Sequence, residues 1–196
     1  MATPLNELSD EALIDRFRRT GEQRILSELY RRHSKAVYRK CLAIIWDKDA
    51  AQDLTHDAFV KAFLHLKKLR KSSHFKAWLS RIAYHACIDY LKARKRLQLE
   101  EDWQKLENQL PNVTDMEESE EYQNTEFNLA QIEAALQHLG DADRLILVMR
   151  YYEGLSIKAI QELLGLNESA AKMRLMRARN RLTKIIQDGQ ASRKKT

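Results

Sequence analysis

The stretch LSIKAIQELLGLNESAAKMRLMRARNR, residues 155–181, sets how the carboxyl-terminal part of this chain folds. Its pattern predicts a helix over 156–164, a tight turn, and a second helix that begins near Glu168. Gly165 can take the positive backbone angle that ends the first helix, and Asn167 can cap the second. Two helices joined by so short a turn are typical of a helix-turn-helix.

The second of these helices has two different faces. Ala171, Leu175, Ala178 and Leu182 recur at helical spacing and are expected to pack inward. The residues left to face outward are Lys172, Met173, Arg174, Met176, Arg177 and Arg181. Such a face fits a DNA major groove, where Arg and Lys can bond guanine edges or phosphates. A helical hairpin with an ordinary charged surface remains an alternative, because helix-turn-helix patterns also occur by chance.

The composition predicts an all-α protein. Among 196 residues there are only five Gly and two Pro, and Leu, Ala, Lys, Arg and Glu dominate. There is no run of roughly 20 uncharged apolar residues and no secretory signal pattern, so a soluble cytoplasmic protein is expected. Cys41 and Cys87 are far apart in the sequence, and neither belongs to a run of Cys and His with the spacing of a zinc site, which favours buried free thiols over a disulfide or a zinc site.

Charge divides the chain into three parts. Residues 1–96 hold 21 Lys and Arg against 11 Asp and Glu, residues 97–128 hold one against ten, and residues 129–196 hold twelve against seven. The middle part contains Pro111 and little periodicity, which is the composition of a flexible acidic linker. We therefore expect two small helical domains, 1–96 and 129–196, joined by the linker 97–128. A short helix over 103–110 is left open.

The first domain carries four helical patterns. The first begins after Ser9, a suitable cap, and stops at Gly21. The second ends near Trp46, and either Asp47 or Asp49 can cap the third. The fourth begins at Phe75 and runs into the basic segment 92–96.

Three segments of the chain together resemble one family. DLTHDAFVKAF, residues 53–63, resembles the acidic polymerase-binding helix of bacterial sigma factors. FKAWLSRIA, residues 75–83, continuing through DYLK at 89–92, is similar to their helix that meets the downstream promoter element. Residues 155–181 resemble their reader of the upstream element. The three motifs occur in the order found in the extracytoplasmic-function sigma factors, and the chain resembles that subfamily over residues 10–96 and 129–185.

The resemblance implies a polymerase-binding surface on the third helix. Asp53 and Asp57 are one turn apart and share a face, so they could pair with Arg of a partner. The resemblance implies that this partner is a coiled-coil element of the largest polymerase subunits. The surface would comprise Asp53, Leu54, His56 and Asp57, with His56 standing where the family more often has Gln. Phe59 and Phe63 are interpreted as core.

Cations, small polar groups and an aromatic ring meet around the turn at 67–75. That mixture suits a displaced single strand, because rings stack on bases while cations follow phosphates. By resemblance the turn would capture a base extruded from the downstream element. The residues expected to contact this element are Lys71, Ser72, Ser73, His74, Phe75, Arg81, Tyr84, His85 and Lys92. Arg81, Tyr84, His85 and Lys92 are expected to be exposed, and Trp78 is interpreted as core.

At the upstream element, the resemblance adds Ser169 and Ala170 to the outward residues of the reader helix. His85 stands where the family usually has Asn, and Ala170 where it usually has Thr, which leaves the promoter sequence open.

The function that the resemblance implies is promoter-directed initiation of transcription. The protein would bind core RNA polymerase, recognise the downstream (minus-ten) and upstream (minus-thirty-five) elements and help to melt promoter DNA. An anti-sigma protein is an expected partner, and no cofactor or metal is expected. An enzyme is disfavoured because no glycine-rich nucleotide loop, metal cluster or nucleophile motif occurs. Two further classes of protein stay open, a conventional DNA-binding regulator that uses residues 129–185 and a helical scaffold.

Overall fold

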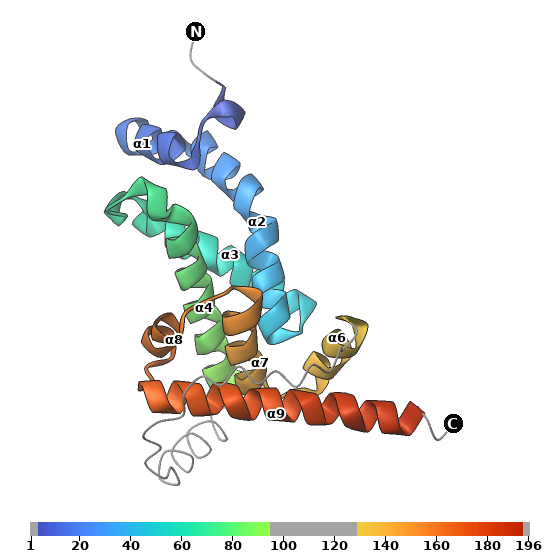
Figure 1. Ribbon diagram of the computed structural model, residues 1–196. Helices are drawn as coiled ribbons and strands as arrows, with labels where there is room; N and C mark the ends of the chain where they lie inside the picture. The colour runs from blue at the N-terminus through green and yellow to red at the C-terminus, as the bar shows by residue number, and fades with distance from the viewer. Residues whose placement is uncertain (1–3, 95–128, 194–196) are drawn as a thin grey trace. The chain divides into compact units, whose positions relative to one another are not determined.

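The computed structural model describes residues 4–94 and 129–193, and the chain divides into two compact units, residues 1–93 and 94–196. Every regular element within the described residues is helical, which confirms the all-α prediction (Figure 1). The elements of the first unit are η1 (Leu5–Glu7), α1 (Asp10–Thr20), α2 (Gln23–Ile45), α3 (Lys48–His65), η2 (Leu66–Lys68), η3 (Ser72–His74) and α4 (Phe75–Arg94). Those of the second are α6 (Leu129–His138), α7 (Asp141–Leu147), η4 (Val148–Tyr152), α8 (Ile157–Leu164) and α9 (Glu168–Arg193).

Local capping sets the helix ends of the first unit. Ser9 Oγ accepts a hydrogen bond from the Ala12 amide at 3.2 Å, and Gly21 ends α1 with a φ of 68°. Trp46 ends α2 with a φ of 58°, a left-handed backbone conformation that residues other than Gly and Asn rarely adopt. Asp47, one of the two residues predicted to cap α3, accepts bonds from two amides at 3.0 Å.

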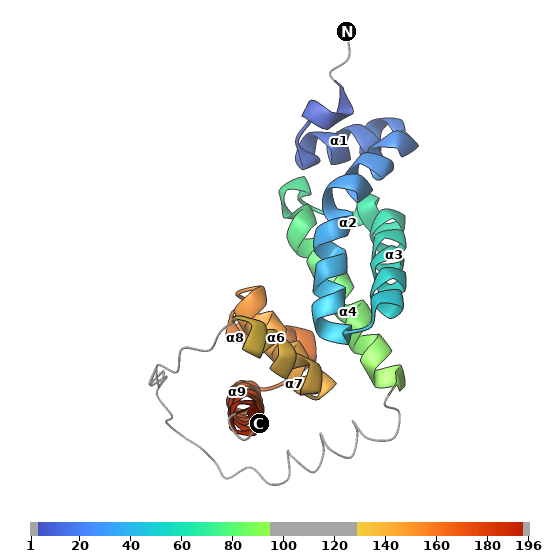
Figure 2. The ribbon, with the colours of Figure 1, turned by 90° about the vertical axis from the view of Figure 1, so that its right-hand side faces the viewer.

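The core of the first unit lies between α2, α3 and α4, with α1 packed on α2. Figure 2 shows α2 and α3 running side by side, and these two helices contact each other along their lengths. The core is aliphatic and aromatic, and includes Leu13, Ile25, Leu29, Ile44, Phe59, Phe75 and Leu79. Cys41 and Cys87 are buried and free, as predicted.

In the second unit, α6, α7 and α8 all pack against α9. The predicted helix-turn-helix is confirmed: Gly165 ends α8 with a φ of 67°, and Asn167 Oδ1 accepts a 2.7 Å bond from the Ala170 amide at the start of α9. Ala171 and Ala178 are fully buried beneath the outer face of α9. The helix α7 passes into a π-helical turn, η4, before α8.

The predicted linker, residues 97–128, and the short helix considered at 103–110 lie outside the described residues. Within the residues that are described, no helix is long and apolar enough to span a membrane.

Candidate functional site

The outer face of α3 carries the predicted acidic pair. Asp53, His56 and Asp57 are all exposed, with the two carboxylates one helical turn apart. Leu54, predicted to share this surface, is buried instead. Leu54 lies on the buried side of α3 together with Ala51 and Ala58, so its side chain packs in the core. Leu54 was expected to belong both to the apolar stripe and to the polymerase-binding surface; its burial agrees with the first expectation and removes it from the exposed surface, which consists of Asp53, His56 and Asp57.

Two apolar side chains continue this face of α3. Val60 and Leu64 lie seven and eleven positions after Asp53 and are 44% and 74% exposed. Phe59 is buried as predicted, with its ring centroid 4.7 Å from that of Tyr30. Phe63 is half-buried beside it. This face of α3 thus changes along the helix from charged to apolar, a feature that the sequence reasoning missed.

The basic turn between α3 and α4 exposes its cations. Lys67, Lys68, Arg70 and Lys71 face solvent, as do Ser73 and His74. Leu66 and Leu69 are buried and hold the turn to the first unit. The geometry therefore presents positive charge together with small polar groups, as expected of a surface that follows a nucleic-acid backbone.

Phe75 does not take part in that exposed surface. Its side chain is 1% exposed, and its ring centroid lies 5.4 Å from that of His33 and 6.3 Å from that of Trp78. Phe75 begins the inward stripe of α4 that continues with Leu79 and Ala83. The prediction that this ring is available to stack on a base is wrong for this structure.

A polar network that the sequence reasoning missed joins this turn to α1. Arg18 Nη1 lies 3.1 Å from Asp15 Oδ1 and 3.1 Å from Ser72 Oγ. Arg18 Nη2 donates to the Leu69 carbonyl, and Ser72 Oγ donates to Asp15 Oδ1 at 2.6 Å. No short-range pattern could predict these contacts, because Asp15 and Ser72 are 57 positions apart.

On α4, three of the four side chains predicted to be exposed are so. Arg81, His85 and Lys92 face solvent, and His85 Nδ1 lies 2.8 Å from the Arg81 carbonyl. Tyr84 is 2% exposed. The Nζ atom of Lys40 lies 4.9 Å from the centre of the Tyr84 ring, a cation–π distance. The prediction that Tyr84 is exposed is wrong, because its side of α4 packs against α2.

Lys40 is itself buried, with its Nζ donating to Ser80 Oγ at 2.6 Å. The pair therefore joins α2 to α4 close to the exposed Arg81.

The outer face of α9 is graded in exposure. Ser169 and Lys172 are exposed at its start, and Lys172 Nζ lies 3.0 Å from Glu168 Oε1. The half-buried members of the predicted set are Ala170, Met173, Arg174, Met176 and Arg177. Arg181 is exposed as predicted, yet its Nη1 bonds the nearly buried carboxylate of Asp143 on α7 at 2.6 Å.

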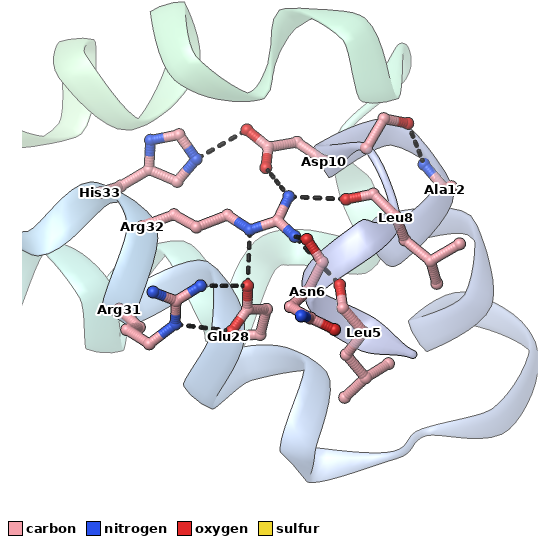
Figure 3. Close-up of polar contacts among 10 residues, drawn as sticks. Leu5, Asn6, Leu8, Asp10, Ala12, Glu28, Arg31, Arg32 and His33 are labelled. Atoms are coloured by element: carbon pink, nitrogen blue, oxygen red, sulfur yellow. Dashed lines mark hydrogen bonds and ion pairs between the residues drawn. The ribbon is translucent and has the colours of Figure 1, made fainter. Parts of the chain in front are cut away.

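The start of α1 is fixed to α2 by a second polar cluster (Figure 3). Arg32 Nε donates to Glu28 Oε1 at 2.7 Å, and its Nη1 lies 3.1 Å from Asp10 Oδ1. His33 Nε2 lies 2.6 Å from the other oxygen of Asp10. The same guanidinium also donates to the carbonyls of Leu5, Asn6 and Leu8. Hydrogen bonds from Arg31 and Arg32 lower the pKa of Glu28 to about 2.

The described residues hold no group of three His, Cys, Asp or Glu side chains that could bind a metal ion. What they offer is one acidic and apolar face on α3, one basic turn with exposed side chains on α4, and one helix-turn-helix.

Two family profiles match the chain. Residues 29–97 match Sigma-70 region 2, and residues 129–182 match Sigma-70, region 4. The first match contains α3, the basic turn and α4, and the second contains the helix-turn-helix.

Known proteins of similar sequence include the ECF RNA polymerase sigma factor SigE of Mycolicibacterium smegmatis, which is 28% identical over 185 residues, or 91% of this chain and 68% of that protein. The RNA polymerase sigma-H factor of Pseudomonas aeruginosa is 27% identical over 187 residues, or 93% of this chain and 96% of that protein.

Solved structures support the same fold. The sigma factor RpoE of Bartonella quintana, in complex with the anti-sigma factor NepR, has a TM-score of 0.55 at 21% identity and covers 82% of this chain and 96% of its own. CnrH, in complex with the cytosolic domain of CnrY, has a TM-score of 0.55 at 23% identity, and the match covers 91% of this chain and 97% of CnrH.

Proposed function

The chain belongs to the extracytoplasmic-function group of the sigma-70 family of RNA polymerase sigma factors, and we propose that its three exposed surfaces divide the work of initiation. As a member of this family it binds core RNA polymerase, recognises both promoter elements and directs transcription initiation. It is a transcription initiation factor, and we place its action in the cytoplasm with the polymerase that it directs.

Docking on the polymerase is assigned to the outer face of α3. The observation that carries this assignment is the exposed pair Asp53 and Asp57, one turn apart and followed by exposed Val60 and Leu64. Exposed carboxylates contribute little to folding, but they can form charge-assisted bonds to Arg of a partner helix. The apolar pair would then cover apolar surface next to those bonds.

Contact with the downstream element is assigned to the basic turn and the exposed side of α4. The cations at 67, 68, 70 and 71 would follow phosphates, and Ser73 and His74 would meet an extruded base. Arg81, His85 and Lys92 extend the same surface along α4. Extruding a base costs a few kcal/mol of unstacking, so binding energy would drive the melting of the DNA.

Recognition of the upstream element is assigned to the start of α9. Ser169 and Lys172 are both exposed there, and residues near the start of a recognition helix usually reach base edges. An anti-sigma protein that covers one or more of these three surfaces is the regulator that we propose, since RpoE of Bartonella quintana was solved with such a partner.

The docking assignment is tested with the double substitution Asp53→Ala, Asp57→Ala. Each charge-assisted bond contributes about 1.5 kcal/mol or more, so losing two should weaken binding to core polymerase by about a hundredfold. Affinity is measured by fluorescence anisotropy of the labelled full-length protein titrated with core polymerase. The control, Glu7→Ala with Glu11→Ala, removes two exposed carboxylates of the same unit and should bind normally.

Wild-type affinity in the Asp53, Asp57 variant would exclude this face as the docking surface. A second measurement addresses the conventional regulator: the free protein is expected to bind duplex promoter DNA weakly without polymerase. Tight, sequence-specific binding by the free chain would favour the regulator instead.

A further inference from the structure

We propose that Asp15 and Arg18 of α1 are positioning residues for the basic turn, and thereby control which downstream promoter element the protein selects. The proposal rests on the function proposed above for that turn. Neither residue lies within the segment that matches Sigma-70 region 2, which begins at residue 29.

The contacts form a closed network around one hydroxyl group. Ser72 Oγ donates its single hydrogen to Asp15 Oδ1 at 2.6 Å and accepts from Arg18 Nη1 at 3.1 Å. Arg18 and Asp15 also bond each other at 3.1 Å. Because both roles of the hydroxyl are used, its orientation is determined by α1.

Arg18 holds the turn at two points. One nitrogen of its guanidinium bonds Ser72, and the other bonds the carbonyl of Leu69, three positions earlier. The segment between those points carries Arg70 and Lys71, which are exposed. A planar, forked donor that bonds both ends of a short segment restricts the backbone between them. The placement of these two cations is therefore tied to α1.

The helix that provides this support is itself held in place. Leu13, Ile14 and Phe17 are buried, and the start of α1 is bonded to α2 through Arg32 and His33 (Figure 3). Thus α1 is anchored at its first turn and holds the basic turn near its last.

Such an arrangement prepares the turn for binding. A loop already held in its bound conformation does not lose further conformational freedom when it captures DNA. Removing the support should therefore weaken discrimination at the downstream element, while the helix-turn-helix, which lies in the other unit, should keep its preference.

The test uses the full chain with core RNA polymerase and two promoter libraries, one randomised in the downstream element and one in the upstream element. Transcripts are sequenced to give the preference for each base. Arg18→Ala removes the guanidinium bonds to Ser72 and Leu69. It should lower the downstream preference by about tenfold, which corresponds to about 1.4 kcal/mol, and leave the upstream preference unchanged. Arg18→Lys, which retains the charge, should restore part of it.

Arg16→Ala is the matched control. Arg16 and Arg18 belong to the same helix, both side chains are 27% exposed, and each forms an ion pair, that of Arg16 being with Glu22 at 3.0 Å. Equal effects of Arg16→Ala and Arg18→Ala would overturn the proposal, because they would show a general loss of stability. Equal loss of preference at both promoter elements would overturn it as well.

If Arg18→Ala does not fold, Asp15→Asn tests whether α1 positions the basic turn. Asp15 is 57% exposed, so this change should be tolerated, and it should lower the downstream preference in the same direction by a smaller factor. An unchanged downstream preference with Asp15→Asn would overturn the proposal. If the wild-type holoenzyme showed no base preference at either element, the proposed function itself would fail.

Discussion

Replacing Arg181 with alanine is expected to destabilise the second unit and to leave DNA affinity almost unchanged. Arg181 Nη1 bonds Asp143 Oδ2 at 2.6 Å, and the Asp143 side chain is only 11% exposed. Loss of a bond to a nearly buried carboxylate costs about 1–3 kcal/mol. Because the Arg181 side chain is 60% exposed, water screens the pair and the lower end, about 1 kcal/mol, applies. For a unit of this size the melting temperature should fall by about 4–8 °C.

The measurement combines denaturation with hydrogen exchange. Urea denaturation of the full-length protein gives the free energy of unfolding, and faster amide exchange in α7 and α9 assigns the loss to the second unit. A double-mutant cycle with Asp143→Asn isolates the pair, because Arg181→Ala should then have little further effect. Arg179→Ala, an exposed neighbour on α9, should change stability by less than about 0.5 kcal/mol.

The competing expectation is that Arg181 contacts a DNA phosphate. In that case Arg181→Ala would leave the free energy of unfolding unchanged, and the salt dependence of promoter binding by the holoenzyme would fall by about one in slope. That result would refute the assignment of Arg181 to the Asp143 pair.

Three further results are expected. In transcription from a library of upstream elements, Lys172→Ala should change which element is chosen, by about 1–3 kcal/mol of discrimination, whereas Arg177→Ala should lower transcription from all elements alike. A changed preference with Arg177→Ala and an unchanged one with Lys172→Ala would contradict this. Asn167→Ala should lower the free energy of unfolding of the second unit by about 1 kcal/mol in urea denaturation, because it removes the cap of α9; an unchanged value would show that the cap is dispensable. The pKa of Glu28 is lowered in the folded protein, so its ionised form stabilises the fold fully above about pH 4.5, and this contribution is lost as the pH falls toward 2. The difference in the free energy of unfolding between wild type and Glu28→Gln should therefore shrink over that range; a difference that does not change with pH would show that ionised Glu28 does not stabilise the fold.

Helix boundaries could be predicted because they depend on neighbours within a few residues. Ser9, Asp47 and Asn167 each cap a helix by accepting bonds from amides two or three positions later. Gly21 and Gly165 end helices with positive φ, as their lack of a Cβ allows. The order of the motifs likewise identified the family without a structure.

The direction of individual side chains was less predictable. Leu54, Phe75 and Tyr84 were expected to be exposed or available to a partner, and all three are buried. In α4, five of the six residues from 83 to 88 are buried, so its inward sector is wider than a single helical stripe. A pattern of apolar residues cannot show how wide that sector is, because the width depends on which other helices pack there.

The helical class, the caps, the helix-turn-helix and the family could all be inferred from the amino-acid order, since each depends on residues close together in the chain. Which Arg side chains bond to other residues of the protein, and are therefore not free to contact a partner, depends instead on tertiary packing. Arg181 bonds a carboxylate 38 positions away, and Arg18 bonds a hydroxyl 54 positions away. Neither pair shares a helix, so no periodicity links its members. They meet because burial of the apolar faces brings the helices that carry them together.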